Sequence, residues 1–347
     1  MKSNRLVVIL WVLFAGACIG LGLLAFSFTR TMVANYTGVG INPFQPGELQ
    51  GGATAEPGTL PTPVQVLATP RPWDGASRVT MLVMGIDYRD WEAGEGAPRS
   101  DSMMVVTFDP ITGQGGFLSI PRDLWVEIPG FGHNRINTAY MFGEASQLPG
   151  GGPALAMQTV ENLIGVPIQY YAVIDFHTFE QFIDEIGGID VLVREEMRIA
   201  PIGAETSIAL EAKPYHFNGA ESLAYARVRK GAGDDFGRAE RQQQVILAVI
   251  DRIVGFDMLP GLIARAPALY QEMATGVRTN LSLDQMISLA WSALRIPKED
   301  ILRGVIAPPQ MIEFYTRPDG AQVLRPVSDQ IRALRDTIFL ETSAISP

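Results

Sequence analysis

The order of apolar and polar positions changes character at about Ser77, where short β-rich runs begin to alternate with segments of helical spacing. Continuous apolar runs of this length are typical of buried strands, and apolar residues three and four positions apart are typical of helices. Strands are expected over 79–86, 102–108, 116–120, 169–175, 189–193 and 223–228. Helices are expected over 152–164, 176–186, 236–254, 259–272 and 282–294. Strands that alternate with helices predict an α/β sheet covered on both faces.

A hairpin is expected close to the end of the chain. Its strands would lie at 311–316 and 321–324, around a turn at Pro318-Asp319-Gly320. We therefore divide the folded part into a first domain at 77–255 and a C-terminal segment at 256–347, in which helices and the hairpin pack on that domain.

The first thirty residues carry a different pattern. Lys2 and Arg5 precede an uncharged, mostly apolar run at 6–28, and Arg30 follows it. Such a run can span a bilayer as a helix, and basic residues at the short end favour a cytoplasmic position for that end. Residues 1–30 are thus predicted to be a cytoplasmic stub and a single transmembrane anchor, with the rest of the chain extracytoplasmic.

Two alternatives to the anchor remain open. Ala15 and Ala17 resemble a signal-peptide cleavage site, and the stretch 15–18 loosely resembles a lipoprotein box. Either cut would leave an apolar stretch at 21–28 behind it, which favours the uncleaved anchor. The following residues, 31–76, are rich in Pro, Gly and Thr and predict a semi-extended linker.

Composition narrows the range of functions. The net charge of -10 argues against a partner that is nucleic acid. Only four of the 27 basic residues are lysines, and arginine is the better bidentate partner for phosphate. Genomic bias is the alternative reason for that skew. One cysteine and three histidines exclude an internal disulfide and make a multi-histidine metal site improbable.

A first group of candidate residues lies at the ends of two expected strands. Asp87 follows the first strand, and Arg99 and Asp101 lie at the start of the second. Two carboxylates that bracket a loop can converge on a hard cation, and magnesium takes one or two carboxylates and completes its shell with phosphate and water. The alternative is a pair of acidic loop ends without a ligand.

A second group, Arg122 and Asp123, follows the third expected strand. Taken alone, such a pair is often a surface ion pair.

The third group is the richest. On a strand at 223–228 and just beyond it, Arg227 and Arg229 would point to one face. On the helix that follows, Arg238 and Gln242 are four positions apart and share a face. A helix that begins near Asp235 would offer its positive dipole end to an anion. Asp235 as a plain N-cap, with the arginines on a solvated face, is the alternative.

At these residues the sequence resembles the LytR-CpsA-Psr family. Six motifs carry the resemblance, and their common order makes it specific. They are Gly85-Ile86-Asp87, Arg99-Ser100-Asp101-Ser102-Met103, Ser119-Ile120-Pro121-Arg122-Asp123, Arg135-Ile136-Asn137-Thr138-Ala139-Tyr140, Ile186-Gly187-Gly188-Ile189-Asp190-Val191, and Arg227-x-Arg229 followed by Asp235-Phe236-Gly237-Arg238-x-x-Arg241-Gln242-Gln243. Arg135 stands where lysine is commoner in the family and keeps the charge.

The resemblance implies a three-layer α/β/α fold with a central mixed sheet, and a pocket that buries a polyprenyl chain. Asp87 and Asp101 would hold Mg²⁺, and Asp235 would orient or deprotonate an acceptor hydroxyl. The pyrophosphate would be bound by Arg99, Arg122, Arg227, Arg229, Arg238 and Gln242. Of these residues, Asp101, Arg122, Arg229, Asp235 and Arg238 are the candidate catalytic set.

The implied activity is phosphoryl transfer at the cell membrane. A glycopolymer would pass from a polyprenyl-pyrophosphate carrier to a cell-wall acceptor glycan, a reaction that needs positioning and charge neutralisation rather than a covalent nucleophile. A pyrophosphatase and a non-catalytic lipid-phosphate-binding regulator are the alternatives. The sequence contains no Gly-x-Ser-x-Gly elbow, P-loop or His-Glu-x-x-His motif.

The helix expected at 176–186 carries an apolar stripe. Phe176, Phe179, Phe182, Ile183 and Ile186 share one face of it. Core packing against the sheet is one interpretation. The other is that part of the stripe lines a tunnel for the isoprenoid.

Overall fold

The computed structural model describes residues 78–87, 97–229, 235–256, 258–294 and 296–339. The expected anchor at 1–30 and the whole of the expected linker at 31–76 lie outside these residues. Within the part that is described, no helix is long and apolar enough to cross a membrane.

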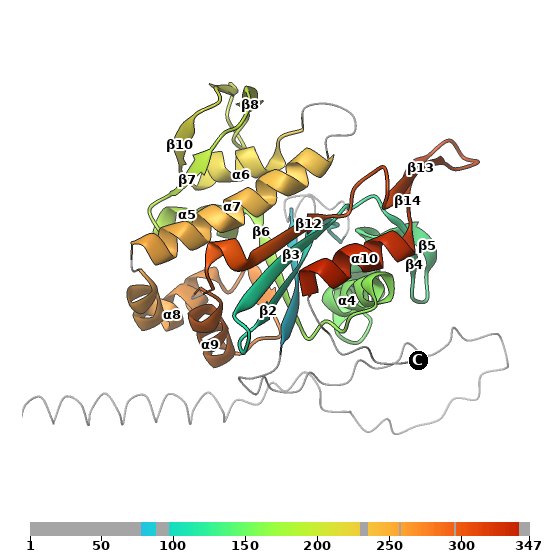
Figure 1. The fold of residues 1–347 in the computed structure, drawn as a ribbon, viewed down its shortest axis with the longest axis horizontal. Coiled ribbons are helices and arrows are strands. Elements are labelled where there is room, and N and C mark those ends of the chain that lie inside the picture. Colours follow the sequence, from blue (N-terminus) through green and yellow to red (C-terminus); the bar gives the residue numbers. More distant parts are fainter. Residues whose placement is uncertain (1–77, 88–96, 230–234, 257, 295, 340–347) are drawn as a thin grey trace, which may run out of the picture. The chain divides into compact units, whose positions relative to one another are not determined.

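The centre of the fold is a six-stranded mixed sheet (Figure 1). Its order is β11 (Val277–Thr279), β6 (Tyr170–Asp175), β1 (Val79–Ile86), β2 (Ser100–Asp109), β3 (Gln114–Ile120) and β12 (Ile301–Val305). β1 runs parallel to β6 and β12 parallel to β3, whereas the other three pairings are antiparallel. The expected α/β fold with a mixed sheet is confirmed.

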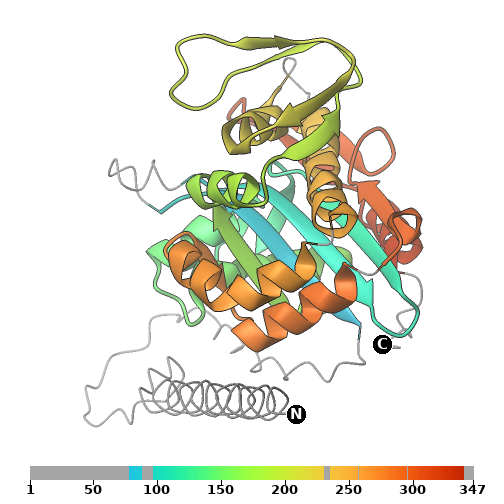
Figure 2. The ribbon, with the colours of Figure 1, turned by 90° about the vertical axis from the view of Figure 1, so that its left-hand side faces the viewer.

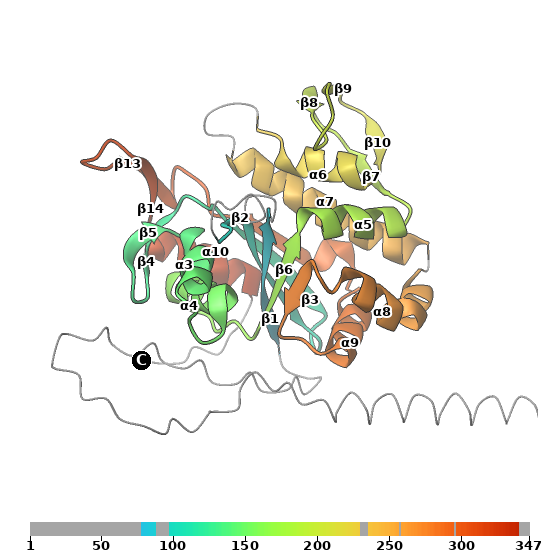
Figure 3. The same cartoon turned by 180° about the vertical axis from the view of Figure 1, so that it is seen from behind.

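Helices cover both faces of this sheet, as Figure 3 shows for the helices on either side of β1 and β6. One face packs against α3 (Thr138–Ala145), α4 (Gly151–Ile164) and α10 (Ser328–Phe339). On the other side lie α5 (Phe176–Glu185), α6 (Gly219–Arg227), α7 (Asp235–Gly255), α8 (Leu259–Met273) and α9 (Leu283–Ala293).

Strand alternation assigns side chains to these two layers. On β1, Leu82, Met84 and Ile86 belong to the core under α4 and α10, and Val79 belongs to the core under α7 and α9. Val83 and Gly85, on the same side as Val79, line a cavity. One face of β1 is therefore filled with apolar side chains along its length, and the other is filled at one end and open at the other.

Four two-stranded sheets lie outside the central one. They pair β4 (Trp125–Ile128) with β5 (Gly132–Arg135), β7 (Ile189–Leu192) with β10 (Pro214–Phe217), β8 (Met197–Ile199) with β9 (Ile208–Leu210), and β13 (Ile312–Thr316) with β14 (Gln322–Pro326). The last pair is the hairpin expected from sequence. The strand expected at 189–193 does form, but in the sheet with β10. Figure 2 shows this part projecting beyond the helices that cover the central sheet.

The strand expected at 223–228 is wrong, because these residues belong to helix α6. Asn218 and Glu221 form a capping box at its start: the Asn218 side chain accepts from the Glu221 amide, and the Glu221 side chain accepts from the Asn218 amide. The short, mostly apolar run at 223–228 suggested a strand, but the cap and the burial of this segment against α7 favour a helix.

The C-terminal segment contributes to the central sheet. β11 and β12, both after residue 255, form its two edges. The sheet is therefore completed by residues beyond residue 255, the expected end of the first domain. Helix α8 precedes β11 in the chain, and helix α9 lies between β11 and β12. α10, also in this segment, packs on β3 and β12.

Candidate active site

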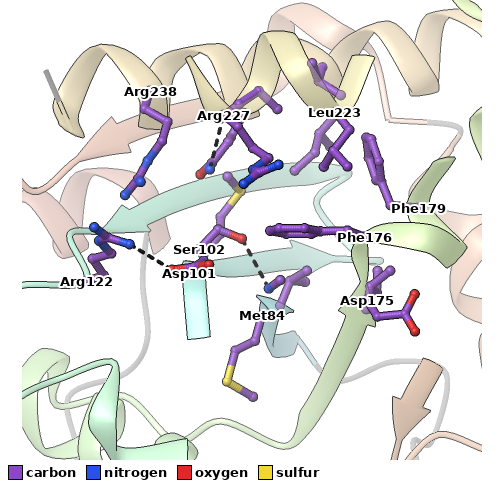
Figure 4. A pocket seen from close by; sticks show the side chains of 18 of the residues that line it. Met84, Asp101, Ser102, Arg122, Asp175, Phe176, Phe179, Leu223, Arg227 and Arg238 are labelled. Carbon is purple, nitrogen blue, oxygen red and sulfur yellow. Dashed lines mark hydrogen bonds and ion pairs between the residues drawn. The ribbon is translucent and has the colours of Figure 1, made fainter. Parts of the chain in front are cut away.

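A cavity of about 290 Å³ lies between the sheet and helices α5, α6 and α7. It is polar at one end and apolar at the other, and Figure 4 shows residues from both ends. Besides Ser102, the polar residues that line it are Asp101, Arg122, Asp175, Arg227, Arg229, Arg238 and Gln242. Six of these seven come from the sequence-predicted site, although they stand on four separate segments of the chain.

A β-bulge places Asp101 at this cavity. Gly85 pairs with Ser102, but the next residue, Ile86, pairs with Ser100, so Asp101 is the extra residue on β2. The Ser102 hydroxyl accepts a 3.1 Å hydrogen bond from the Gly85 amide, which joins the two strands beside the bulge. A Cβ at Gly85 would lie 2.5 Å from that hydroxyl oxygen, so the close approach requires glycine.

Arg122 reaches Asp101 from the loop after β3. Its Nη1 donates a 2.7 Å hydrogen bond to Asp101 Oδ1, and its Nε lies 3.7 Å from Asp123 Oδ2. Asp123 in turn lies 3.3 Å from Arg135 Nε. Asp123 and Arg135 flank the site, whereas Asp101 and Arg122 form part of the cavity wall.

The other cations come from the junction of α6 and α7. Arg227 is the last residue of α6, and its guanidinium lies over the Phe176 ring, 4.8 Å from the centroid. Arg229 follows after one extended residue, and its Nε lies 3.4 Å from Asp235 Oδ1. Both arginines line the cavity, although the strand geometry expected for them is wrong.

Asp235 and Arg238 lie on the first turn of α7. Arg238 Nη2 is 2.9 Å from Asp235 Oδ1, which places Asp235 between Arg229 and Arg238. Burial lowers the pKa of Arg238 to about 10. The neighbouring Arg229 and Arg122 also lower this pKa, whereas the carboxylates of Asp235 and Asp101 raise it. At neutral pH the guanidinium is therefore charged, and it carries this charge in a site where other positive charges already stand close. Such a site favours an anion.

Gln242 stands one turn after Arg238 and lines the same cavity. Its Nε2 donates to Ala226 O at 3.5 Å. The expectation that these two residues share one face of a helix is confirmed.

Two further residues of α7 hold the site in place and had no role in the sequence-based prediction. Arg241 Nη2 donates a 2.6 Å hydrogen bond to Val228 O, the residue between the two cavity arginines. The buried Gln243 side chain donates from Nε2 to Ser119 Oγ at 2.9 Å and to Gly304 O at 2.8 Å. Their position in the Arg-Gln-Gln run was a signal, but only the structure shows what they contact.

The apolar end of the cavity is formed by the sheet and three helices. Its side chains are Val83, Met104, Ile174, Phe176, Phe179, Leu223, Val245 and Ile246. The stripe expected on α5 divides here: Phe176 and Phe179 line the cavity, whereas Ile183 and Ile186 are fully buried in the core beneath α7. Phe182 packs against that core.

Three predicted site residues are not among those that line the cavity. Arg99 is exposed just before β2, and Asp87 is buried directly after the last residue of β1. Asp235 stands behind the lining, between Arg229 and Arg238. Within the described ranges, no three His, Cys, Asp or Glu side chains gather as a metal-binding group. Magnesium needs only one or two carboxylates when phosphate and water complete its shell. Asp87 directly follows β1 and Asp101 lies on its partner strand β2, so the two would supply the carboxylates that such an ion requires.

Comparisons with known proteins agree with this arrangement. The LytR_cpsA_psr family model matches residues 61–333. The regulatory protein MsrR of Staphylococcus aureus is 36% identical over 181 residues, which are 52% of this chain and 50% of MsrR. The polyisoprenyl-teichoic acid–peptidoglycan teichoic acid transferase TagV of Bacillus subtilis is 32% identical over 266 residues, 75% of this chain and 63% of TagV.

Solved structures give the same result. The crystal structure of B. subtilis TagV is 31% identical, has a TM-score of 0.61, and the match covers 76% of this chain and 96% of that one. A structure of YwtF (TagT) with bound octaprenyl pyrophosphate lipid is 21% identical with a TM-score of 0.54, over 77% of this chain and 92% of that one, and shares the fold. This chain spans about half the length of MsrR. Because the family model matches most of its length, including every strand of the central sheet, the chain belongs to the LytR_cpsA_psr family.

Proposed function

We propose that this chain transfers a glycopolymer phosphate from a polyprenyl-pyrophosphate carrier to a hydroxyl of a cell-wall acceptor. The observation that carries the proposal is the two-ended cavity. Four arginines line one end and mainly apolar side chains line the other. A lipid pyrophosphate has the same two parts, a strongly anionic group attached to a long hydrocarbon.

The charged end suits the pyrophosphate. Arg122, Arg227, Arg229 and Arg238 would contact its oxygens, since guanidinium groups bind phosphate through charge-assisted and bidentate hydrogen bonds. Gln242 would add a neutral donor on the same helix face as Arg238. Arg99, which is exposed outside the cavity, is proposed to contact phosphate from its rim.

The apolar end suits the isoprenoid. Phe176, Phe179 and Leu223 from the helices line it together with Val83 and Ile174 from the sheet. Burial of hydrocarbon against such a wall contributes roughly 25 cal/mol for each Å² removed from water. The ring of Phe176 also lies beneath the Arg227 guanidinium and so stands at the boundary between the two ends.

The reaction is a phosphoryl transfer. The acceptor hydroxyl oxygen would form a bond to the phosphorus that carries the glycan, and the bond from that phosphorus to the bridging oxygen would break. Polyprenyl phosphate would leave with the electron pair. Asp235, held between Arg229 and Arg238, is proposed to orient the hydroxyl or to take its proton. The arginines would stabilise the charge that develops on the transferred group.

We further propose that Asp87 and Asp101 hold a magnesium ion, whose charge would neutralise phosphate oxygens when it is bound. Asp101 Oδ1 accepts from Arg122, and its second oxygen, Oδ2, is the one proposed to face the metal.

The name of TagV, a polyisoprenyl-teichoic acid–peptidoglycan teichoic acid transferase, supports a polyprenyl-linked donor and a peptidoglycan acceptor for this chain. The basic residues before the apolar run at 6–28 support a single-pass anchor at the cytoplasmic membrane, with the domain outside. A reporter fused after Pro347 tests this topology, because activity of that reporter only in the cytoplasm would contradict it.

The test of function incubates the full-length protein with a lipid-linked glycan pyrophosphate, with and without an acceptor glycan. Formation of a glycan–acceptor phosphodiester is the expected result. Release of free glycan phosphate whether or not acceptor is present would indicate a pyrophosphatase instead. Lipid binding without any product would indicate a non-catalytic binding protein.

A further inference from the structure

A second cavity lies on the opposite side of helix α7. It measures about 640 Å³ and is bounded by α7, by the edge strand β12 and by the segment after β7. Its polar lining residues are Arg194, Glu195, Tyr225, Glu240, Arg241, Gln243, Gln244 and Arg303. None of these residues lines the first cavity, so the proposed phosphoryl-transfer site does not account for this one.

On the first turn of α7, two neighbouring residues line different cavities. Gly237 lines the second cavity, and its neighbour Arg238 lines the first. An α-helix with its side chains is only about 10–12 Å across. A polymer bound in the second cavity could therefore present one of its hydroxyl groups at the phosphate site by passing the beginning of this helix.

The second cavity carries charges of both signs. Three exposed residues line it: Arg194 after β7, Arg303 on β12 and Glu240 on α7. Within the part of the chain that the structure describes, these three side chains have no ion-pair partner. Charged groups that are exposed in a concave site and not paired with one another are available to a ligand.

This mixture of charges discriminates between the two substrates. A teichoic-acid-type polymer carries repeated negative charges, which Glu195 and Glu240 would oppose. A glycan strand that bears short peptides carries amino and carboxylate groups together, and these match the glutamates and arginines respectively. Gln243, Gln244 and Tyr225 hydrogen-bond within the protein, so the charged side chains carry the recognition.

We propose that the second cavity binds the acceptor, a hydroxyl-rich glycan strand whose short peptides carry both amino and carboxylate groups. The proposal rests on the proposed transferase function and adds the place of its second substrate. The donor pyrophosphate occupies the first cavity, and the acceptor strand extends past the first turn of α7 from the second.

The test is binding rather than turnover. Full-length protein in detergent is titrated with soluble peptide-bearing peptidoglycan strands, and the Kd is measured by calorimetry. The double variant Arg194→Glu/Arg303→Glu should raise this Kd by about tenfold or more, because it reverses two charges that face the ligand. Arg332→Glu is the matched control, since Arg332 is an exposed arginine on α10, which packs on the other face of the sheet. It should change the Kd less than about twofold.

A second variant guards against misfolding of the first. Glu240→Gln should weaken binding of strands with free amino groups and should not weaken binding of strands whose amino groups are acetylated. Unchanged strand binding in both variants would overturn the proposal, and so would a loss of donor-lipid binding in place of strand binding. Transfer by the wild-type protein is measured separately: if no product forms, the transferase proposal fails whatever the strand Kd shows.

Discussion

The carboxylate of Asp101 accepts a 2.7 Å hydrogen bond from the guanidinium of Arg122, although the two residues belong to different strand ends. The contact depends on the bulge that makes Asp101 an extra residue on β2. One acidic group thus lies beside the arginines of the cavity, with one oxygen bonded to Arg122 and the other proposed to face a cation.

Asp101→Ala should therefore abolish magnesium-dependent transfer and retain binding of the lipid pyrophosphate through the remaining arginines. Turnover is measured against magnesium concentration, and lipid binding is measured by calorimetry on the same preparation. Magnesium-stimulated turnover in the variant at the wild-type level would contradict the metal role of Asp101.

Arg229→Ala should lower turnover by roughly 10²-fold. It removes one of several cations that strengthen their contact with phosphate in the transition state, so the loss should be smaller than the about 10³–10⁵-fold reported for a single arginine finger. Its side chain is 38% exposed, so the thermal melt should change little. Full activity of the variant with an unchanged thermal melt would contradict the proposed site. Lost activity with a collapsed melt would favour a structural role for the Arg229–Asp235 ion pair.

The buried position of Arg238 predicts a dependence on pH. Because its pKa is lowered to about 10, pyrophosphate binding should be constant from about pH 7 to 9 and weaken as the pH rises through 10. Arg238→Lys should move this loss to lower pH, because lysine starts from an ordinary pKa of about 10.4 and the same burial lowers it further.

The contribution of Arg238 to the free energy of unfolding should increase over the pH range in which pyrophosphate binding weakens. A base whose pKa is lower in the folded state binds fewer protons there, so this group makes the folded state more stable as the pH rises from 10 towards the ordinary arginine pKa. A weaker binding constant without unfolding is the expected pattern, and circular dichroism on the titrated samples checks it. Identical pH profiles for wild type and Arg238→Lys would argue against this assignment.

Phe179 and Phe182 lie on the same helix and both pack against the core beneath α7, but of the two only Phe179 also lines the cavity, which gives a matched pair. Phe179→Asn should weaken lipid binding by about tenfold, because it removes an apolar wall of the cavity. Phe182→Asn should cost stability, since Phe182 packs against the core, but should leave lipid affinity unchanged. Equal effects on lipid affinity would show that the isoprenoid does not occupy this end.

Gln243→Leu should destabilise the protein by about 1–3 kcal/mol, because Gly304 O and Ser119 Oγ would lose their partner in a buried place. The exposed Gln330 on α10 is the control, and Gln330→Leu should change the free energy of unfolding by less than about 0.5 kcal/mol. Urea denaturation of both variants gives the comparison. Equal effects would mean that the two hydrogen bonds of Gln243 do not hold α7 to the sheet.

Much of the fold was determined by local patterns that can be read along the chain. The apolar runs at β1, β2, β3 and β6 and the helical spacing of α4, α5 and α7 predicted those elements to within two residues at each end. The spacing of Arg238 and Gln242 correctly predicted one helix face. These features depend on a periodicity of two or 3.6, which the sequence carries by itself.

The segment at 223–228 shows where such patterns fail. Its mostly apolar run suggested a strand. The Asn218–Glu221 capping box in front of it favoured a helix and could have been recognised from the sequence. Arg227 reaches the cavity from the last position of helix α6, and Arg229 follows the extended residue Val228. A period-two pattern of side chains does not predict this backbone path. For side chains next to a turn, the backbone conformation of the turn determines the direction in which they point.

Only the tertiary structure decided which strands lie at the edges of the sheet and where the two cavities open. β11 and β12 are short and come from the last part of the chain, and they become strands because β6 and β3 offer them unpaired edges. The contacts of Arg122 with Asp101 and of Gln243 with Gly304 join residues 21 and 61 positions apart. The sequence by itself determined which residues could bind phosphate, because composition and periodicity are local properties. The order of the strands in the sheet decided which of these residues share one cavity. That order determines which strand ends and helix ends lie next to each other in space.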